Sequence, residues 1–379
     1  MRLVPINCIK ENSYLAQPLY DGDGRILLKI GVQLNEPLLK KVEEVGVHSL
    51  YIQDEYSDYE IEDIIKPQMR NKAVRTIKET FKAFEKSGSA NNTPRKIKAL
   101  EQAKEKQVAS LRDVSKEIVD EISSNKNIMI NLVDIKTLDS YIYEHSVNTA
   151  VLSMALGIEL GLNKNELYDL CIGAMLHDIG KVFIPKDILF KENPTEEEAE
   201  LIQRHTEKGY EYLKDNGVVT GLAKIIVLQH HEHVDGTGSP AGIVGSNINK
   251  LARIVAITNK YDNLTSGSPG LKPVPPHEAL EYIMGAAGRY FDFDMTRSFM
   301  KKVVPYPIGT LVRLSNGDVG VVDEVFENYP LRPRIRIVRQ IANRIEMEFV
   351  ELMKEISLVI EGILYEVPNV SVQHYLKTK

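Results

Sequence analysis

Residues 170–181 read LCIGAMLHDIGK, an apolar stretch that ends in a histidine, an aspartate and a lysine. The spacing of its apolar residues predicts a helix. His177 and Asp178 are adjacent, so on one helix their side chains would point about 100° apart. Such a pair can bind two neighbouring metal ions, with the aspartate bridging them. We therefore expect a mainly α domain built around this pair.

Four more histidines lie in stretches that also read as helices: His145, His205, His230 and His231. Neutral imidazole and carboxylate are ligands of transition metals, and this many donors can bind more than one ion. Read singly, His145 is typical of a structural histidine and His205 of an exposed helix residue. Taken together, the donors indicate a metal site.

Two metal ions a few Å apart are a known arrangement for cleaving phosphoric esters, because a water shared by two cations ionises near neutral pH. Lys181 follows His177 by one turn. Its ammonium is expected near a non-bridging phosphate oxygen, where it would neutralise charge that develops in the transition state. The sequence therefore predicts a helical metallophosphohydrolase, with Asp178 and Lys181 as catalytic residues.

The rest of the chain divides by pattern into flanking segments. Residues 1–65 read as a small α/β domain, with a turn at 20–24, a helix over 36–45 and strands on either side. Residues 66–128 read as a charged helical connector, with a break at 87–94. The main domain is predicted over 129–303. A small β-rich segment is predicted over 304–379, where Asn316-Gly317 is a strong hairpin signal.

Composition excludes several classes of protein. The 379 residues carry a formal charge of −6 with acids and bases interspersed, so no basic face indicates binding of duplex DNA or RNA. The two cysteines, Cys8 and Cys171, fit neither a disulfide framework nor a Cys-x-x-Cys site, which suits a reducing compartment. No apolar run is long enough for a signal peptide or a membrane span. We expect a cytoplasmic protein. The charged pattern of the connector favours a solvated helical spacer, and the alternative is the contact surface of a homodimer.

The segment Leu176–Lys181 resembles the signature of the HD superfamily of metal-dependent phosphohydrolases. The segment 230–240, HHEHVDGTGSP, resembles the second signature of its HD-GYP subfamily. The resemblance extends through 145–148, 184–189, 253–256 and 262–266. It implies an all-helical domain with two iron or manganese ions. It also implies phosphodiesterase activity on cyclic di-GMP, which gives the linear dinucleotide pGpG or GMP.

The resemblance also implies roles for individual residues. Asn259 occupies a position where the family has an aspartate ligand, and its neutral carbonyl would be a weaker donor to a second ion. Tyr141, one turn before His145, fits the two-metal pattern of the family. Asp262 and Lys272 are expected to contact substrate together with Lys181. The resulting set of expected metal ligands is His145, His177, Asp178, His205, His230, His231 and Asn259.

Two further departures concern the substrate loop. The tyrosine of the Gly-Tyr-Pro signature is Ser239 here, and a segment that usually carries arginines is replaced by Gly267–Leu271. Ser268 and Leu271 would forfeit contacts to the dinucleotide. Three functions therefore remain open: a phosphodiesterase for cyclic di-GMP or a related cyclic dinucleotide, a catalytically degenerate module that acts as a nucleotide sensor or scaffold, and a phosphatase for a smaller nucleotide.

Overall fold

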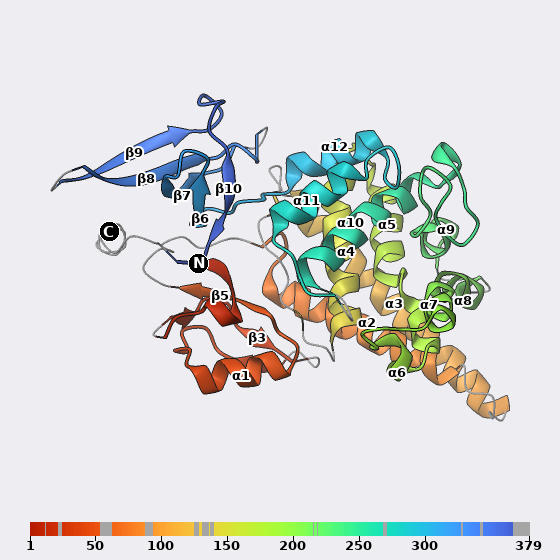
Figure 1. Cartoon of the computed structure of the whole chain (residues 1–379). Coiled ribbons are helices and arrows are strands. Elements are labelled where there is room, and N and C mark those ends of the chain that lie inside the picture. The colour runs from red at the N-terminus through yellow and green to blue at the C-terminus, as the bar shows by residue number, and fades with distance from the viewer. Residues whose placement is uncertain are drawn as a thin grey trace. The chain divides into compact units, whose positions relative to one another are not determined.

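The computed structural model in Figure 1 separates into two compact units, each described here by itself. One unit comprises 63–130 and 139–300, and the other comprises 1–62, 131–138 and 301–379. No helix among the described residues is long and apolar enough to cross a membrane. The structure describes residues 1–11, 13–21, 25–53, 63–87, 94–124, 129–130, 136, 140–214, 216–217, 219–267, 271–326, 329–341 and 344–366.

The first unit is helical, which confirms the mainly α fold class. Its centre is α4 (Tyr141–Glu159), whose residues from His145 to Gly157 are all buried. Helix α4 packs against α5 (Lys164–Leu176) and α10 (Lys250–Ser266), and α5 packs against α9 (Gly221–Gln229). This mutual packing explains why these helices are apolar over most of their surface rather than along one stripe. The centre of the bundle is where the predicted metal ligands lie.

Two long helices cover this centre: α2 (Pro67–Ser87) and α3 (Pro94–Ser124). They pack against each other, α2 also against α4 and α3 against α5. The side chains of Phe81, Phe84 and Leu111 are buried. Among the described side chains of these two helices, no large apolar one is highly exposed. The predicted connector is thus packed on the helical unit, and its alternative role as a dimer surface stays a prediction.

Capping residues set where two of the helices begin. Asn163 and Glu166 form a reciprocal capping box at the start of α5, and Thr195 and Glu198 form another at α7 (Glu196–Gln203). Helix α7 ends at Gln203 and His205 begins α8 (His205–Leu213), so the helix that starts at the Thr195 capping box does not carry His205.

His177 and Asp178 differ from expectation, since they do not share one helix. Helix α5 ends at Leu176, His177 is its C-cap, and Asp178 precedes the 3₁₀ helix η2 (Ile179–Phe183). Gly180 in η2 lies directly against the backbone of α8, since a Cβ there would be 1.9 Å from the carbonyl oxygen of His205. The remaining elements of this unit are α6 (Lys186–Leu189), η3 (Gly245–Asn247), α11 (Pro276–Gly285) and α12 (Phe293–Lys302).

The second unit contains the β structure. At its N-terminal end, β1 (Arg2–Pro5), β5 (Ser49–Gln53) and β2 (Tyr14–Leu15) form an antiparallel sheet in the order β1-β5-β2. Short strands β3 (Leu19–Tyr20) and β4 (Ile26–Leu28) pair beside it, with η1 (Ile6–Cys8) and α1 (Glu36–Glu44). The predicted helix and returning strand are confirmed. The turn glycines at 22 and 24 lie outside the described residues.

The C-terminal strands form a five-stranded antiparallel sheet in the order β10-β6-β7-β8-β9. Gly317 has φ 86° in the turn between β6 and β7, a conformation that glycine adopts without strain, so the predicted hairpin is confirmed. The strands are β6 (Leu311–Leu314), β7 (Val319–Glu324), β8 (Arg334–Ile341), β9 (Arg344–Glu351) and β10 (Ile360–Leu364).

Candidate metal centre and active site

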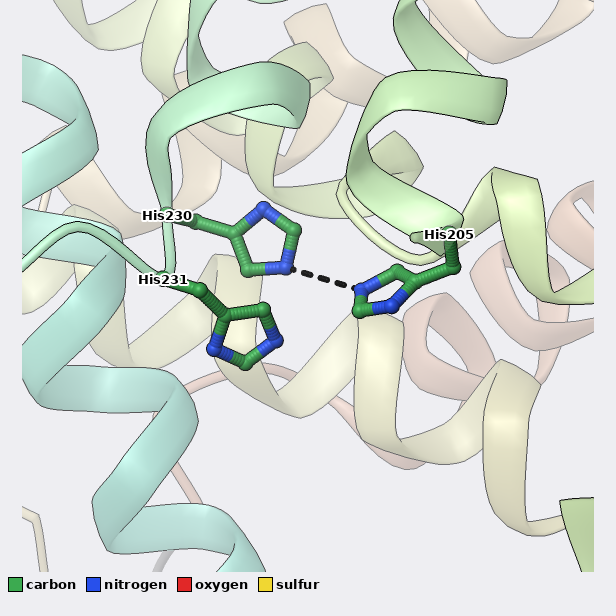
Figure 2. Close-up of side chains that lie close together, drawn as sticks. All are labelled: His205, His230 and His231. Carbon is green, nitrogen blue, oxygen red and sulfur yellow. Dashed lines mark hydrogen bonds between the residues drawn. The ribbon is translucent and has the colours of Figure 1, made fainter. Parts of the chain in front are cut away.

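Six of the predicted ligands gather in two groups of three inside the helical unit. The first group is His205, His230 and His231, and the second is His145, His177 and Asp178. In each group the donor atoms lie within 4.8 Å of one another. Figure 2 shows the first group, with His230 and His231 at the end of α9 facing His205 at the start of α8. The fold thus brings together donors that are up to 86 positions apart in sequence, from 145 to 231.

Asp178 lies between the two groups. Its Oδ2 is 3.5 Å from Nε2 of His177 and 3.7 Å from Nε2 of His145. Its Oδ1 is 3.2 Å from Nε2 of His205 and 4.0 Å from Nε2 of His230. One carboxylate oxygen therefore faces each group, which is the placement that a ligand bridging two cations needs.

Backbone carbonyls orient three of the imidazole rings. Nδ1 of His177 donates to the carbonyl of Ala174 at 2.7 Å, and Nδ1 of His205 donates to that of Ile202 at 2.7 Å. Nδ1 of His230 donates to the carbonyl of Val227 at 2.9 Å. Because the proton is held on Nδ1, the lone pair of each Nε2 faces the centre.

Burial favours the neutral form of three rings, those of His177, His230 and His231. It lowers the pKa of His177 to about 4, and the neighbouring His145 adds to that shift while Asp178 opposes it. Burial, with His231 and His177 close by, holds the pKa of His230 well below its usual value. Burial and the neighbouring His205 lower the pKa of His231 in the same direction. Neutral imidazole is the form that binds a metal, so the rings are poised as ligands at neutral pH.

Asp178, in contrast to these neutral rings, is held in its ionised form. Burial works to raise its pKa, but the charges of His177 and Lys181 and the contact with His205 outweigh it, so the pKa lies well below its usual value. Lys181 Nζ donates to Oδ2 of Asp178 at 2.6 Å. Oδ1 is buried and accepts no hydrogen bond of good geometry from the described residues, although Nε2 of His205 lies 3.2 Å away. A buried carboxylate oxygen without a donor is costly, and a cation would satisfy it.

The donor set therefore fits divalent metal ions. Five imidazoles and a carboxylate converge, and the three Nδ1 protons bound to backbone carbonyls leave nitrogen lone pairs turned inward. Nitrogen and carboxylate oxygen suit iron, manganese and zinc better than magnesium or calcium, which prefer oxygen alone.

Asn259 lies on α10 and is buried. Its Oδ1 accepts a hydrogen bond from Nδ2 of Asn263 at 2.7 Å, and Oδ1 of Asn263 accepts one from the hydroxyl of Tyr141. The two hydrogen bonds that link Tyr141, Asn263 and Asn259 orient the amide of Asn259. The role of Asn259 as a metal ligand remains a prediction.

The three residues expected to contact substrate lie in different surroundings. Lys181 lies beside Asp178, and Asp262 is fully buried on α10 with its carboxylate against His145. Lys272 is exposed, and so is Leu271. Ser268 lies outside the described residues, so its expected loss of contact has no structural counterpart here.

Glu232 was not singled out from the sequence, yet it holds the loop that follows the histidine pair. Its carboxylate accepts hydrogen bonds from the backbone N–H of Ala241 at 2.8 Å and of Ile243 at 2.9 Å. The N–H of Ser239 donates to the carbonyl of His231 at 3.0 Å. The loop is thus fixed through backbone groups, and at position 239 every residue except proline has the N–H that this requires. The signal available in the sequence was a glutamate directly after the histidine pair, in a segment that contains glycines.

Comparison with known proteins gives two family matches. Residues 119–295 match the family of the HD domain, and residues 311–366 match the KOW domain associated with HD domain. The second match covers the sheet formed by β6 to β10.

Curated relatives match part of the chain. The chain is 38% identical over 226 residues to a cyclic di-GMP phosphodiesterase of Pseudomonas aeruginosa, covering 58% of this chain and 54% of that protein. It is 37% identical over 155 residues to a 3′3′-cGAMP-specific phosphodiesterase of Vibrio cholerae, covering 40% of this chain and 35% of that protein. The chain thus spans about half or less of the length of these relatives.

Among solved structures, the chain is similar to Bd1817, an HDG"Y"P protein from Bdellovibrio bacteriovorus. The TM-score is 0.51 at 19% identity, and the match covers 79% of this chain and 97% of that one. At this identity the likeness concerns the fold. The family matches show that this chain contains an HD domain over residues 119–295, followed at 311–366 by a KOW domain associated with HD domain.

Proposed function

We propose that this protein is a metal-dependent phosphodiesterase that hydrolyses cyclic di-GMP, or a related cyclic dinucleotide, to the linear dinucleotide pGpG or to GMP. The observation that carries the proposal is the position of Asp178, with one oxygen toward each group of donors. The relatives named as cyclic di-GMP and cGAMP phosphodiesterases support the substrate class. The two free thiols, one buried and one partly buried, suit the reducing cytoplasm in which we place the reaction.

We assign the ligands to two iron or manganese ions. His145 and His177 would hold one ion, His205, His230 and His231 the other, and Asp178 would bridge them. When bound, such ions supply Lewis acidity toward a phosphate ester and activate water for attack. Water attacks phosphorus, the bond from phosphorus to the 3′ oxygen breaks, and the 3′ oxygen leaves with a proton.

Lys181 has a separate task in this scheme. Its side chain is 16% exposed, so its ammonium reaches both Asp178 and the solvent side of the site. With Asp178 engaged as a metal ligand, the ammonium of Lys181 would be available to a non-bridging phosphate oxygen. There it would stabilise charge that develops on phosphorus oxygens in the transition state.

The test is hydrolysis of cyclic di-GMP and 3′3′-cGAMP by protein purified without oxygen, with Fe(II) or Mn(II) added and the products separated by chromatography. We expect a linear dinucleotide from the wild type and none from His177→Ala, which removes an imidazole of the centre. Turnover that survives in His177→Ala would contradict the proposed metal centre.

One observation favours a second candidate, a nucleotide sensor without turnover. The amide of Asn259 is neutral and already accepts a hydrogen bond from Asn263, so the centre lacks an anionic donor at this position. A sensor would show saturable binding of a cyclic dinucleotide in equilibrium dialysis, with no product after prolonged incubation with either metal. The same chromatographic assay therefore separates the two functions.

A further inference from the structure

Asp262 is a buried carboxylate on α10, and its side chain is 0% exposed. Its Oδ2 lies 2.6 Å from Nδ1 of His145. Its Oδ1 accepts hydrogen bonds from Nδ2 of Asn148 and, at 3.1 Å, from Oγ of Ser266. Both oxygens are therefore occupied by donors of the protein itself, which argues against a contact with substrate.

The bond to Asp262 determines which nitrogen of His145 carries the proton. A carboxylate is an acceptor only, so the proton of the neutral ring lies on Nδ1. The lone pair then lies on Nε2, which is 3.2 Å from Nε2 of His177 and 3.7 Å from Oδ2 of Asp178. The ring of Tyr141 stacks parallel to that of His145, with the two ring centroids 5.6 Å apart and an interplanar angle of 4°. This stacking supports the orientation of the imidazole.

His145 differs in this respect from the other oriented histidines. His177, His205 and His230 give their Nδ1 protons to neutral backbone carbonyls, whereas His145 gives its proton to a carboxylate. A carboxylate partner raises the basicity of the opposite nitrogen and strengthens its bond to a metal.

We propose that Asp262 is a positioning residue: it fixes the tautomer and orientation of His145 so that Nε2 binds a metal ion, and it does not contact the nucleotide. This inference rests on the metal centre of the proposed function but not on turnover. It accounts for a buried carboxyl group that no other part of the site explains, because such a group is retained in an interior only where hydrogen-bond partners converge on it.

The informative substitution is Asp262→Asn, which keeps the shape and removes one acceptor. Three donors would then face an amide that has one oxygen acceptor, so either the amide or a donor around it must rearrange. If that oxygen stays with Asn148 and Ser266, the new NH₂ group faces His145, and the ring takes the tautomer with its proton on Nε2. Its metal-binding lone pair is then lost from the centre.

The matched control is Asp294→Asn, the same chemical change at an exposed residue of α12 that pairs with Arg297. We expect Asp262→Asn to weaken the binding of one Mn(II) ion per chain by about 10- to 100-fold in equilibrium dialysis. Asp294→Asn should leave both the affinity and the number of ions unchanged. An affinity within threefold of wild type, with a raised KM for cyclic di-GMP, would overturn the proposal and return Asp262 to substrate binding.

A second measurement needs no substitution at Asp262. Nitrogen-15 spectra of histidine-labelled, metal-free protein report the protonated nitrogen of each ring, and the signal of His145 is the one missing from His145→Gln. We expect its proton on Nδ1, and a proton on Nε2 would refute the inference. A wild type that binds Mn(II) through this residue but hydrolyses nothing would remove the proposed function and leave the positioning role intact.

Discussion

Nζ of Lys181 donates to Oδ2 of Asp178 at 2.6 Å, across the tight turn that joins α5 to η2. The same oxygen faces His145 and His177, so the ammonium occupies the edge of the second group of donors. The pair therefore couples the proposed bridging ligand to the residue that we expect to bind phosphate.

Lys181→Gln removes this positive charge while keeping a hydrogen-bond donor. We expect kcat for cyclic di-GMP to fall by about 100-fold, because one fewer charged donor stabilises the transition state. The number of bound metal ions, measured by elemental analysis, should not change. A loss of metal equal to the loss of activity would show that Lys181 serves the centre instead of the substrate.

Asn259→Asp places an anionic donor at the position where the resemblance predicts a metal ligand. Nδ2 of Asn263 can still donate to the new carboxylate, so the helix need not rearrange. We expect tighter binding of the second metal ion and at least about a tenfold gain in hydrolysis, since a charged oxygen is a better ligand than an amide. If elemental analysis and rates match the wild type, asparagine is tolerated at this position.

Gly180→Ala should damage the site without altering any proposed ligand. A Cβ at 180 would lie 1.9 Å from the carbonyl oxygen of His205 and 2.8 Å from the backbone nitrogen of Gly209, so α8 must move. We expect a loss of about 3 kcal/mol of stability in urea unfolding, together with weaker metal binding. Gly221→Ala is the control, since a Cβ there meets nothing within 4 Å.

The stability of the metal-free protein should fall with acidity. The pKa of His177 is about 4 because of burial, against 6.5 for the free residue, so between these values the unfolded state binds a proton that the native state does not. Stability is therefore full above pH 6.5 and declines as the pH falls toward 4. The contribution of this one residue is about 3 kcal/mol.

The measurement is urea unfolding in EDTA at several pH values, for the wild type and His177→Gln. The difference in unfolding free energy between the two proteins isolates this residue from the carboxylates that also titrate. It should shrink as the pH falls from 7 to 4. A difference that stays constant over this range would show that His177 is protonated at the same pH in both states.

The sequence by itself determined the residue types of the site and the class of the fold. The apolar period around 170–176 specified a helix, Asn316-Gly317 specified a hairpin, and the pairs at 177–178 and 230–231 specified metal-ligand chemistry, because these signals act over a few residues. The tertiary structure alone decided how the donors divide into two groups and that Asp178 lies between them. It also decided that Asp262 faces His145 from another helix. These are contacts between residues up to 117 positions apart, and no local pattern encodes which buried donor meets which buried acceptor.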